Sequence, residues 1–308
     1  LVFVGPVLLP EYPAALQVVG RYLAFGMLAV PLAWVDRHEL KRLSRADWLE
    51  ALKLTLIGNF LYYLCLASAI KRAGAPLPTM VIGTLPVVIS ITANLLNRKR
   101  DGVLPWHQLA PCIAILLSGI ALVNHVEMST LFVSAQTDFS MYFTGAALAV
   151  CAVVCWTWYP LRNANWLRQH ADRRPRVWAT AQGVVTLPVA LIGLLLLGVI
   201  PAGSDEQFLM PFGPRPLTFI GLMLAIGFFS SWLGTLCWNE ASQRLPTALA
   251  GQLIVFETLA ALAYAFILRG ALPHALTLAG IALLIVGVVA TLRIQPRHAV
   301  GTNTSVQG

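Results

Sequence analysis

The chain has few charged residues. Asp, Glu, Lys and Arg make up 11% of its 308 residues, whereas hydrophobic residues make up 58% and the mean hydropathy is +0.74. An ordinary soluble domain carries about a quarter charged residues. Polar groups could not cover this much apolar surface in a soluble fold, so the composition excludes a soluble globular protein and indicates an integral membrane protein.

Catalytic motifs are also missing. The sequence contains no Gly-x-Ser-x-Gly elbow and no Gly-x-x-x-x-Gly-Lys-Ser/Thr loop, and His38-Glu39 lacks the second His of a zincin helix. All five cysteines fall in apolar stretches, and Cys151 and Cys155 have no further His or Cys at metal-ligand spacing. We therefore expect no enzyme activity, no metal site, no cofactor and no ATP-driven transport by this chain alone.

Long apolar runs are abundant, and each of about 20 residues can cross a bilayer. A shorter apolar run, residues 1–10, precedes them and is expected to be the end of a truncated first helix; an interfacial segment or the end of a signal peptide is the alternative. The fold class expected is an all-α integral membrane protein with ten transmembrane helices. The nine complete spans expected are Ala14–Val35, Trp48–Ile70, Pro76–Leu96, Trp106–Val123, Ser140–Leu161, Val177–Ile200, Leu217–Ala241, Thr247–Leu268 and Leu272–Leu292.

The chain contains an internal duplication. Residues 65–97 align without gaps with residues 237–269, and residues 104–123 align with residues 272–291. Ten helices then divide into two repeats of five, residues 1–139 and 140–308, within a single membrane domain. Because five is odd, the second repeat must cross the membrane in the opposite direction, which predicts two inverted five-helix repeats.

The basic residues indicate the orientation in the membrane. With both termini in the cytoplasm, the cytoplasmic loops and tail carry fifteen Lys and Arg residues and the outer loops carry four, while Arg21 and Lys53, expected near helix ends, are left uncounted. Such an excess is the usual positive-inside asymmetry. It also explains the net charge of +8 as anchoring to the inner leaflet, with no pattern typical of nucleic-acid binding.

Polar and aromatic residues at membrane depth are the candidates for a substrate cavity, because burying them in lipid is costly. They follow one face in each of two helices that the duplication relates to each other. Inverted repeats bring such faces together near the bilayer midplane. The candidates are Asn59, Tyr62 and Tyr63 in the earlier helix and Trp232, Thr235, Trp238 and Asn239 in the later one.

The span at residues 140–161 adds Trp156 and Tyr159, which could stack on a substrate ring or bind an organic cation. Trp158 and Tyr159 could equally belong to the aromatic belt at the membrane interface. Five other tryptophans are expected belt residues: Trp34, Trp48, Trp106, Trp166 and Trp178.

One further span carries Gln252, a candidate substrate ligand, and Glu257, a candidate for coupling to a cation. A carboxylate at this depth would be paired, protonated or part of a coupling site, and a structural hydrogen bond is the plainer alternative. Pro86 and Pro160 interrupt their spans and could bend them as gates, although static kinks are the commoner explanation.

The second half, with WLGTLCWNEASQRLPTALAGQLIVFETLAALAYAFILRGALP followed by LAGIALLIVGVV, resembles the EamA-type repeat of the drug/metabolite transporter superfamily. The resemblance covers essentially the whole chain and implies ten helices, cytoplasmic termini and a central cavity. Thr258 follows Glu257 where the family often has proline, so the helix bend of the family is in question there. The chain is most similar to bacterial aromatic amino acid exporters, which implies an inner-membrane exporter of Phe, Tyr, Trp and related metabolites.

Two other functions stay open from the sequence. The first is efflux of organic cations such as methyl viologen by proton antiport, and the second is a membrane-embedded enzyme or scaffold. Partners expected are a small-molecule substrate and the lipid bilayer, with no nucleic acid and no obligate protein partner. Uniport and proton antiport are both consistent with a single candidate carboxylate, Glu257.

Overall fold

The computed structural model describes residues 4–74, 76–96, 104–134, 139–199, 213–256, 259–260 and 275–294. Within these ranges the secondary structure is helical, with no strand. Eight helices in the described residues are long and apolar enough to cross a membrane. The chain is therefore an all-α membrane protein.

The helices of the first half begin with the short α1 (Val4–Leu8) and include one composite helix, residues 45–73, in which α4, η1 and α5 follow without a break. Here η marks a π-helical stretch. The elements are α1 (Val4–Leu8), α2 (Ala14–Val35), α3 (Arg37–Leu40), α4 (Arg45–Leu54), η1 (Thr55–Leu61), α5 (Tyr62–Ala73), α6 (Pro76–Gly83), α7 (Leu85–Leu96) and α9 (Trp106–Ser134).

The second half contains a matching composite helix, residues 216–244, formed by α12, η2 and α13. Its π-helical stretch lies 172 positions after η1, which is also the offset between Cys65 and Cys237. The elements are α10 (Phe139–Gln169), α11 (Pro175–Val199), α12 (Pro216–Ile226), η2 (Gly227–Leu233), α13 (Gly234–Arg244), α14 (Thr247–Gln252) and α16 (Ala275–Leu292).

Two compact units form, and each takes helices from both halves of the sequence. The first unit combines residues 1–82 and 130–244, and the second combines residues 83–129 and 245–308. Because of this interleaving, the spatial units differ from the expected repeats 1–139 and 140–308. The repeat boundaries stay a prediction.

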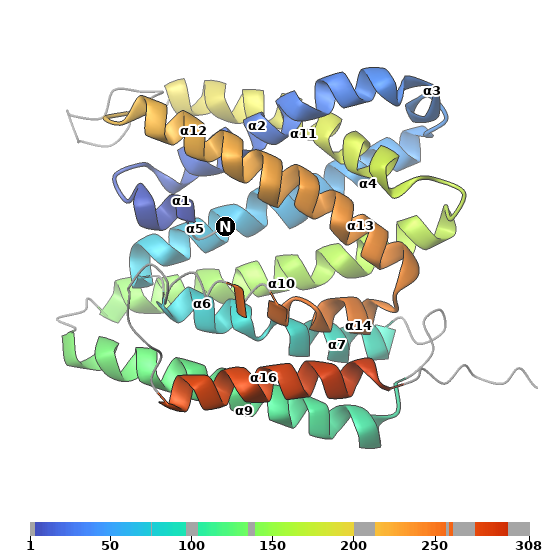
Figure 1. The fold of residues 1–308 in the computed structure, drawn as a ribbon. Helices are drawn as coiled ribbons and strands as arrows, with labels where there is room; N and C mark the ends of the chain where they lie inside the picture. Colours follow the sequence, from blue (N-terminus) through green and yellow to red (C-terminus); the bar gives the residue numbers. More distant parts are fainter. Residues whose placement is uncertain are drawn as a thin grey trace, which may run out of the picture. The chain divides into compact units, whose positions relative to one another are not determined.

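In the first unit, α2 packs along α11 and α5 packs along α10 (Figure 1). Small residues let the backbones of α2 and α11 approach closely. A methyl group on Gly26 would lie 2.7 Å from the Cα of Leu187, and one on Gly183 would lie 2.5 Å from the Cβ of Ala29. Such contacts replace the hydrophobic effect as the packing force between helices in lipid.

In the second unit, α14 packs against α7 and α9 lies beside α16 (Figure 1). A methyl group on Gly119 would lie 2.9 Å from the carbonyl oxygen of Gly280, so these two helices also meet at glycine. The amide of Gln252 donates to Ser90 Oγ at 2.9 Å and ties α14 to α7.

A charged contact ties together two segments that precede long helices. Arg215 Nε donates to Glu11 Oε1 at 2.7 Å, and the Arg215 backbone N–H donates to Tyr12 Oη at 2.9 Å. Partial burial raises the pKa of Glu11, but its hydrogen bonds and the neighbouring guanidinium outweigh this effect and hold the pKa below the ordinary value. The segments before α2 and α12 are thereby held together.

Three of the expected spans differ from the helices in the structure: two helices are longer and one span is divided. The α9 helix continues to Ser134, through residues expected to form a polar loop, because no glycine or proline follows Gly119 before its end. The α10 helix continues to Gln169, since its last turns carry buried residues such as Leu167. The span at residues 76–96 is divided at Thr84 into α6 and α7.

The packing of α2 against α11 predicts a difference between two glycines. Gly26→Val should lower the free energy of unfolding by about 1–3 kcal/mol, because the added methyl groups have no space against Leu187. Gly221→Val is the matched control, since no atom of the described residues lies within 4 Å of a methyl group added there. The measurement is the thermal unfolding of both variants in detergent; equal midpoints would contradict the packing described.

Candidate functional site

Four aromatic rings from three helices meet in the first unit. Trp156 of α10 stacks on Tyr62 of α5, with ring centroids 4.8 Å apart, and on Tyr159 of α10, with centroids 5.0 Å apart and planes 5° from parallel. Trp238 of α13 lies 6.3 Å from Trp156 at a tilt of 42°. These four rings are called the aromatic cluster below, and all four were predicted from the sequence.

The exposure of the rings is uneven. Tyr62 and Tyr159 are buried, whereas Trp156 and Trp238 are partly exposed. The two tryptophans therefore present accessible ring surface, and the two tyrosines support it from behind. The alternative that Tyr159 is an interfacial belt residue does not hold, because the side chain is 1% exposed.

The position of Tyr159 depends on a glycine in the π-helical stretch η1. A methyl group on Gly58 would lie 2.3 Å from Cδ2 of Tyr159, so only glycine lets the ring pack directly on the backbone. A π-helical turn inserts one residue and shifts the face that follows it, and such turns are frequent at functional sites. Here the shift occurs immediately before Tyr62 and Tyr63.

A chain of buried hydrogen bonds extends from the aromatic cluster. Tyr159 Oη donates to Gln182 Oε1 at 3.0 Å, and Gln182 Nε2 donates to Asn163 Oδ1 at 3.1 Å. Asn163 Nδ2 in turn donates to Asn239 Oδ1 at 2.8 Å. The chain connects α10, α11 and α13 and fixes the orientation of the tyrosine.

Trp178 joins the same chain, because its indole N–H donates to Asn163 Oδ1 at 2.8 Å. Trp178 is completely buried and stacks on Trp166, with centroids 3.4 Å apart. The expectation that Trp166 and Trp178 are belt residues is therefore wrong: both pack inside the protein. Trp34 and Trp106 are exposed, at 72% and 43%, as belt residues should be.

Several predicted residues carry buried polar atoms without a hydrogen-bond partner among the described residues. They are Asn59 Nδ2, Tyr63 Oη, Trp232 Nε1 and Trp238 Nε1. A buried donor without a partner costs about 1–3 kcal/mol, so these four atoms are candidates for contact with a ligand. Thr235 is partly buried on α13, the helix that also carries Trp238.

Two residues of the site were not predicted from the sequence. Asn163 was assigned to the polar link after the helix, and Arg21 was placed near a helix end. Arg21 is instead the eighth residue of α2 and is 5% exposed. Its signal in the sequence was present: it is the single charged residue in an apolar run of 22 residues, which marks a functional candidate in a membrane helix.

The remaining candidates lie elsewhere. Gln252 belongs to the second unit, where it bonds Ser90, so its placement beside the aromatic cluster stays a prediction. Glu257 lies outside the described residues, although the preceding helix α14 already ends at Gln252, before a turn at Leu253 and Ile254.

The two prolines behave differently. Pro86 lies at the start of α7, directly after the interruption at Thr84, whereas α10 continues through Pro160 as one helix. Pro86 therefore marks a helix boundary, and Pro160 does not break its helix. Their roles as gates stay a prediction.

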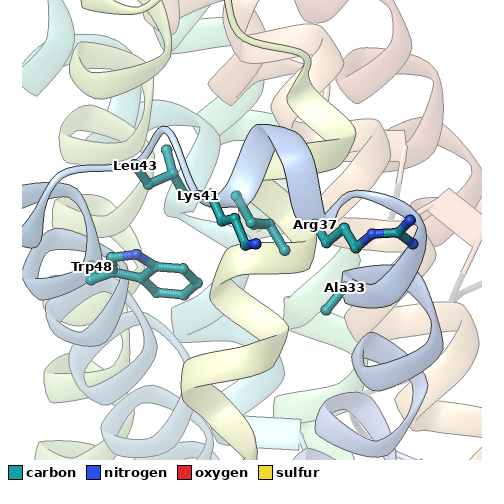
Figure 2. A pocket seen from close by; sticks show the side chains of 6 residues that line it. Ala33, Arg37, Lys41, Leu43 and Trp48 are labelled. Atoms are coloured by element: carbon teal, nitrogen blue, oxygen red, sulfur yellow. The ribbon is translucent and has the colours of Figure 1, made fainter.

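An open hollow of about 360 Å³ lies where α2 ends, beside α3 and the start of α4 (Figure 2). None of the predicted substrate-binding residues lines it. Its lining residues are Ala33, Arg37, Leu40, Lys41, Leu43 and Trp48. In the described residues no group of three or more His, Cys, Asp or Glu side chains could hold a metal ion.

The hydrogen-bond chain predicts a specific sensitivity. Asn163→Leu should lower the free energy of unfolding by about 1–3 kcal/mol or more, because it removes the partner of Trp178, Gln182 and Asn239 at once. Gln169→Leu, at an exposed position on the same helix, is the control. Thermal unfolding in detergent measures both, and an unchanged midpoint for Asn163→Leu would contradict the proposed importance of the chain.

Comparisons with known proteins agree with this architecture. Residues 2–125 match the EamA-like transporter family. The chain is 53% identical over 305 residues to the inner membrane protein YtfF of Escherichia coli (strain K12), covering 99% of this chain and 94% of that protein. A protein of known crystal structure shares the fold with a TM-score of 0.66 at 15% identity, over 91% of this chain and 88% of its own. The chain belongs to the EamA-like transporter family of the drug/metabolite transporter superfamily and is a multi-pass inner-membrane transporter, not an enzyme.

Proposed function

We propose that the protein exports aromatic amino acids and related metabolites from the cytoplasm, and that the aromatic cluster binds the substrate ring. The observation that carries the proposal is the stacking of Trp156 between Tyr62 and Tyr159, with Trp238 beside it. The two tryptophans are partly exposed, so a substrate ring can contact the indole of Trp238 or take the place of one of the existing partners of Trp156.

The energies suit a transporter. Each aromatic pair contributes about 0.5–1.5 kcal/mol beyond the burial of area, so two or three ring contacts give a modest affinity. A transporter needs such modest affinity, because a substrate that binds very tightly is released slowly. The rigid hydrogen-bond chain through Gln182 and Asn163 holds Tyr159 in place, so little conformational entropy is lost when a ring binds.

Alternating access is the transport mechanism that we propose, with repeats 1–139 and 140–308 inverted in the membrane and both termini in the cytoplasm. The equal spacing of the π-helical stretches η1 and η2 supports this interpretation, because a duplicated and inverted unit should repeat its local distortions. Each stretch lies in the middle of a composite helix, where a local change of helical winding can alter the angle between its ends. Pro86 and Pro160 are further candidate gates.

Coupling to protons would require a titratable group in the substrate pathway, and Glu257 is the candidate. A facilitative exporter needs no such group. Uptake of labelled Phe, Trp, Ala and methyl viologen into proteoliposomes, with and without a pH gradient, separates these cases. Aromatic-selective flux that ignores the gradient supports facilitated export, flux that follows the gradient supports antiport, and flux of methyl viologen alone would overturn aromatic amino acid export.

The role of the aromatic cluster predicts that Trp156→Leu reduces the flux of labelled phenylalanine by roughly tenfold or more. The substrate ring loses the indole on which it would stack, and Tyr62 and Tyr159 lose their stacking partner, while the position stays apolar. Trp34→Leu is the control, since Trp34 is 72% exposed and lies outside the cluster. Size-exclusion profiles and melting temperatures of both variants test folding. Phenylalanine flux equal to that of the unchanged protein in a folded Trp156→Leu variant would place the substrate elsewhere.

A further inference from the structure

A single arginine is buried inside the first unit. Arg21 lies seven residues after the start of α2, roughly 10 Å along the helix at 1.5 Å per residue, and its side chain is 5% exposed. A cationic side chain at this depth is expensive and is usually paired or functional.

The guanidinium of Arg21 is held in place by its neighbours. Its Nε donates to Ser231 Oγ of η2 at 2.9 Å, and its Cζ lies 4.5 Å from the centroid of the Tyr63 ring and 5.1 Å from that of Tyr22. The close approach of η2 depends on Gly227, where a methyl group would lie 2.6 Å from the Cβ of Ala24. The π-helical stretch thus positions the group that anchors the arginine.

The arginine nevertheless has no counter-charge among the described residues. No acidic side chain in the described part of the chain forms an ion pair with Arg21. Its Nη1 also has no hydrogen-bond partner there. Glu11, an acidic residue near the start of the same helix, pairs with Arg215 instead. One N–H group of a buried, immobilised cation is therefore available for a ligand.

Two further unpartnered atoms lie close to each other beside Gly5 of α1. Tyr63 Oη and Gln17 Oε1 lie 3.1 Å and 2.9 Å from the position of a methyl group on Gly5. Both side chains are completely buried, and neither atom forms a hydrogen bond of ordinary distance and angle in the described residues, although the Tyr63 hydroxyl lies toward the Arg21 guanidinium. The amide nitrogen of Gln17 donates to the carbonyl oxygen of Leu9 at 3.0 Å, so the orientation of its amide oxygen is fixed.

We propose that Arg21 and the hydroxyl of Tyr63 bind the carboxylate of the transported molecule, while Gln17 Oε1 accepts a hydrogen bond from its ammonium group. This inference rests on the transport function proposed above and adds the class of substrate: an organic acid or zwitterion, not an organic cation. Arginine and a phenol both donate to a carboxylate, and the charge of the ligand neutralises the buried guanidinium. Tyr63 links the two parts of the site, because it follows Tyr62 of the aromatic cluster in α5.

The test compares acids with amines that carry the same hydrocarbon group. The protein is prepared in two forms, in detergent without lipid and in vesicles of phosphatidylcholine alone. Each form is titrated with the acids 3-phenylpropanoate and 4-methylpentanoate and with the amines phenethylamine and isoamylamine. The melting temperature of the protein is measured at each ligand concentration. The acids should stabilise the protein and the amines should not. An equal shift with acid and amine, or no shift with either acid, overturns the inference.

Variants assign the effect to Arg21. Arg21→Gln should weaken binding of 3-phenylpropanoate by about tenfold or more and remove the preference for the acid, because the charged hydrogen bond is lost. Arg72→Gln, at an exposed position of α5, is the matched control and should keep the preference. Unchanged affinity in Arg21→Gln overturns the inference, as does equal loss in Arg72→Gln.

Two milder variants keep the test decisive if Arg21→Gln does not fold. Arg21→Lys retains the charge but loses the planar fork, and Tyr63→Phe retains the ring and loses only the hydroxyl. Both should weaken acid binding by a smaller factor, about three- to tenfold, and Tyr63→Phe should keep the melting temperature in the absence of ligand. Acid binding unchanged in both variants overturns the carboxylate site.

The carboxylate site and aromatic export can fail separately. If 4-methylpentanoate binds as well as 3-phenylpropanoate and both depend on Arg21, the carboxylate site stands and selectivity for aromatic rings fails. If phenylalanine is transported and Trp156→Leu abolishes its flux while Arg21→Gln leaves the flux unchanged, aromatic export stands and the carboxylate site is overturned. A third outcome concerns lipid. If the acids bind in phosphatidylcholine vesicles but not after anionic lipid is added, Arg21 binds a lipid phosphate, and its role in substrate binding is overturned.

Discussion

The need to satisfy polar groups without water is the constraint on which this structure depends. In lipid, an amide or indole N–H that lacks a partner inside the protein has none at all. Asn163 supplies hydrogen-bond partners to three buried side chains at once, since it accepts from Trp178 and Gln182 and donates to Asn239. Because these bonds fix α10, α11 and α13 together, the aromatic cluster rests on a rigid base.

Other buried polar atoms of the first unit lie outside this chain of hydrogen bonds, and we interpret them as ligand contacts. Arg21, Tyr63 and Gln17 all have buried polar atoms without partners in the described residues. The two groups are connected through α5, because Tyr62 stacks on Trp156 and the next residue, Tyr63, lies against Arg21. A molecule with a ring at one end and an acid group at the other would satisfy both parts, and an aromatic amino acid has this form.

Much of the fold could be predicted from the sequence, because runs of about 20 apolar residues are a strong signal. The ring of Trp156 was also predictable, as an aromatic residue at depth. The buried residues at the ends of helices were not: Asn163 and Trp178 look like interfacial residues in the sequence, and only packing against other helices shows that they are inside. Arg21 was misplaced because one charge in an apolar run resembles a frayed end when the position of the membrane is unknown. The π-helical stretches have no recognised sequence signal, although the equal offset of η1 and η2 agrees with the duplication.

A structure with a bound substrate analogue tests the central claim most directly. Crystals grown with 4-bromophenylalanine would locate the bromine by its anomalous scattering, and electron density would show the carboxylate. We expect the bromine to lie against Trp156 and Trp238 and the carboxylate to lie within hydrogen-bonding distance of Arg21. A bromine in the hollow lined by Arg37 and Trp48, or a carboxylate turned away from Arg21, would contradict it.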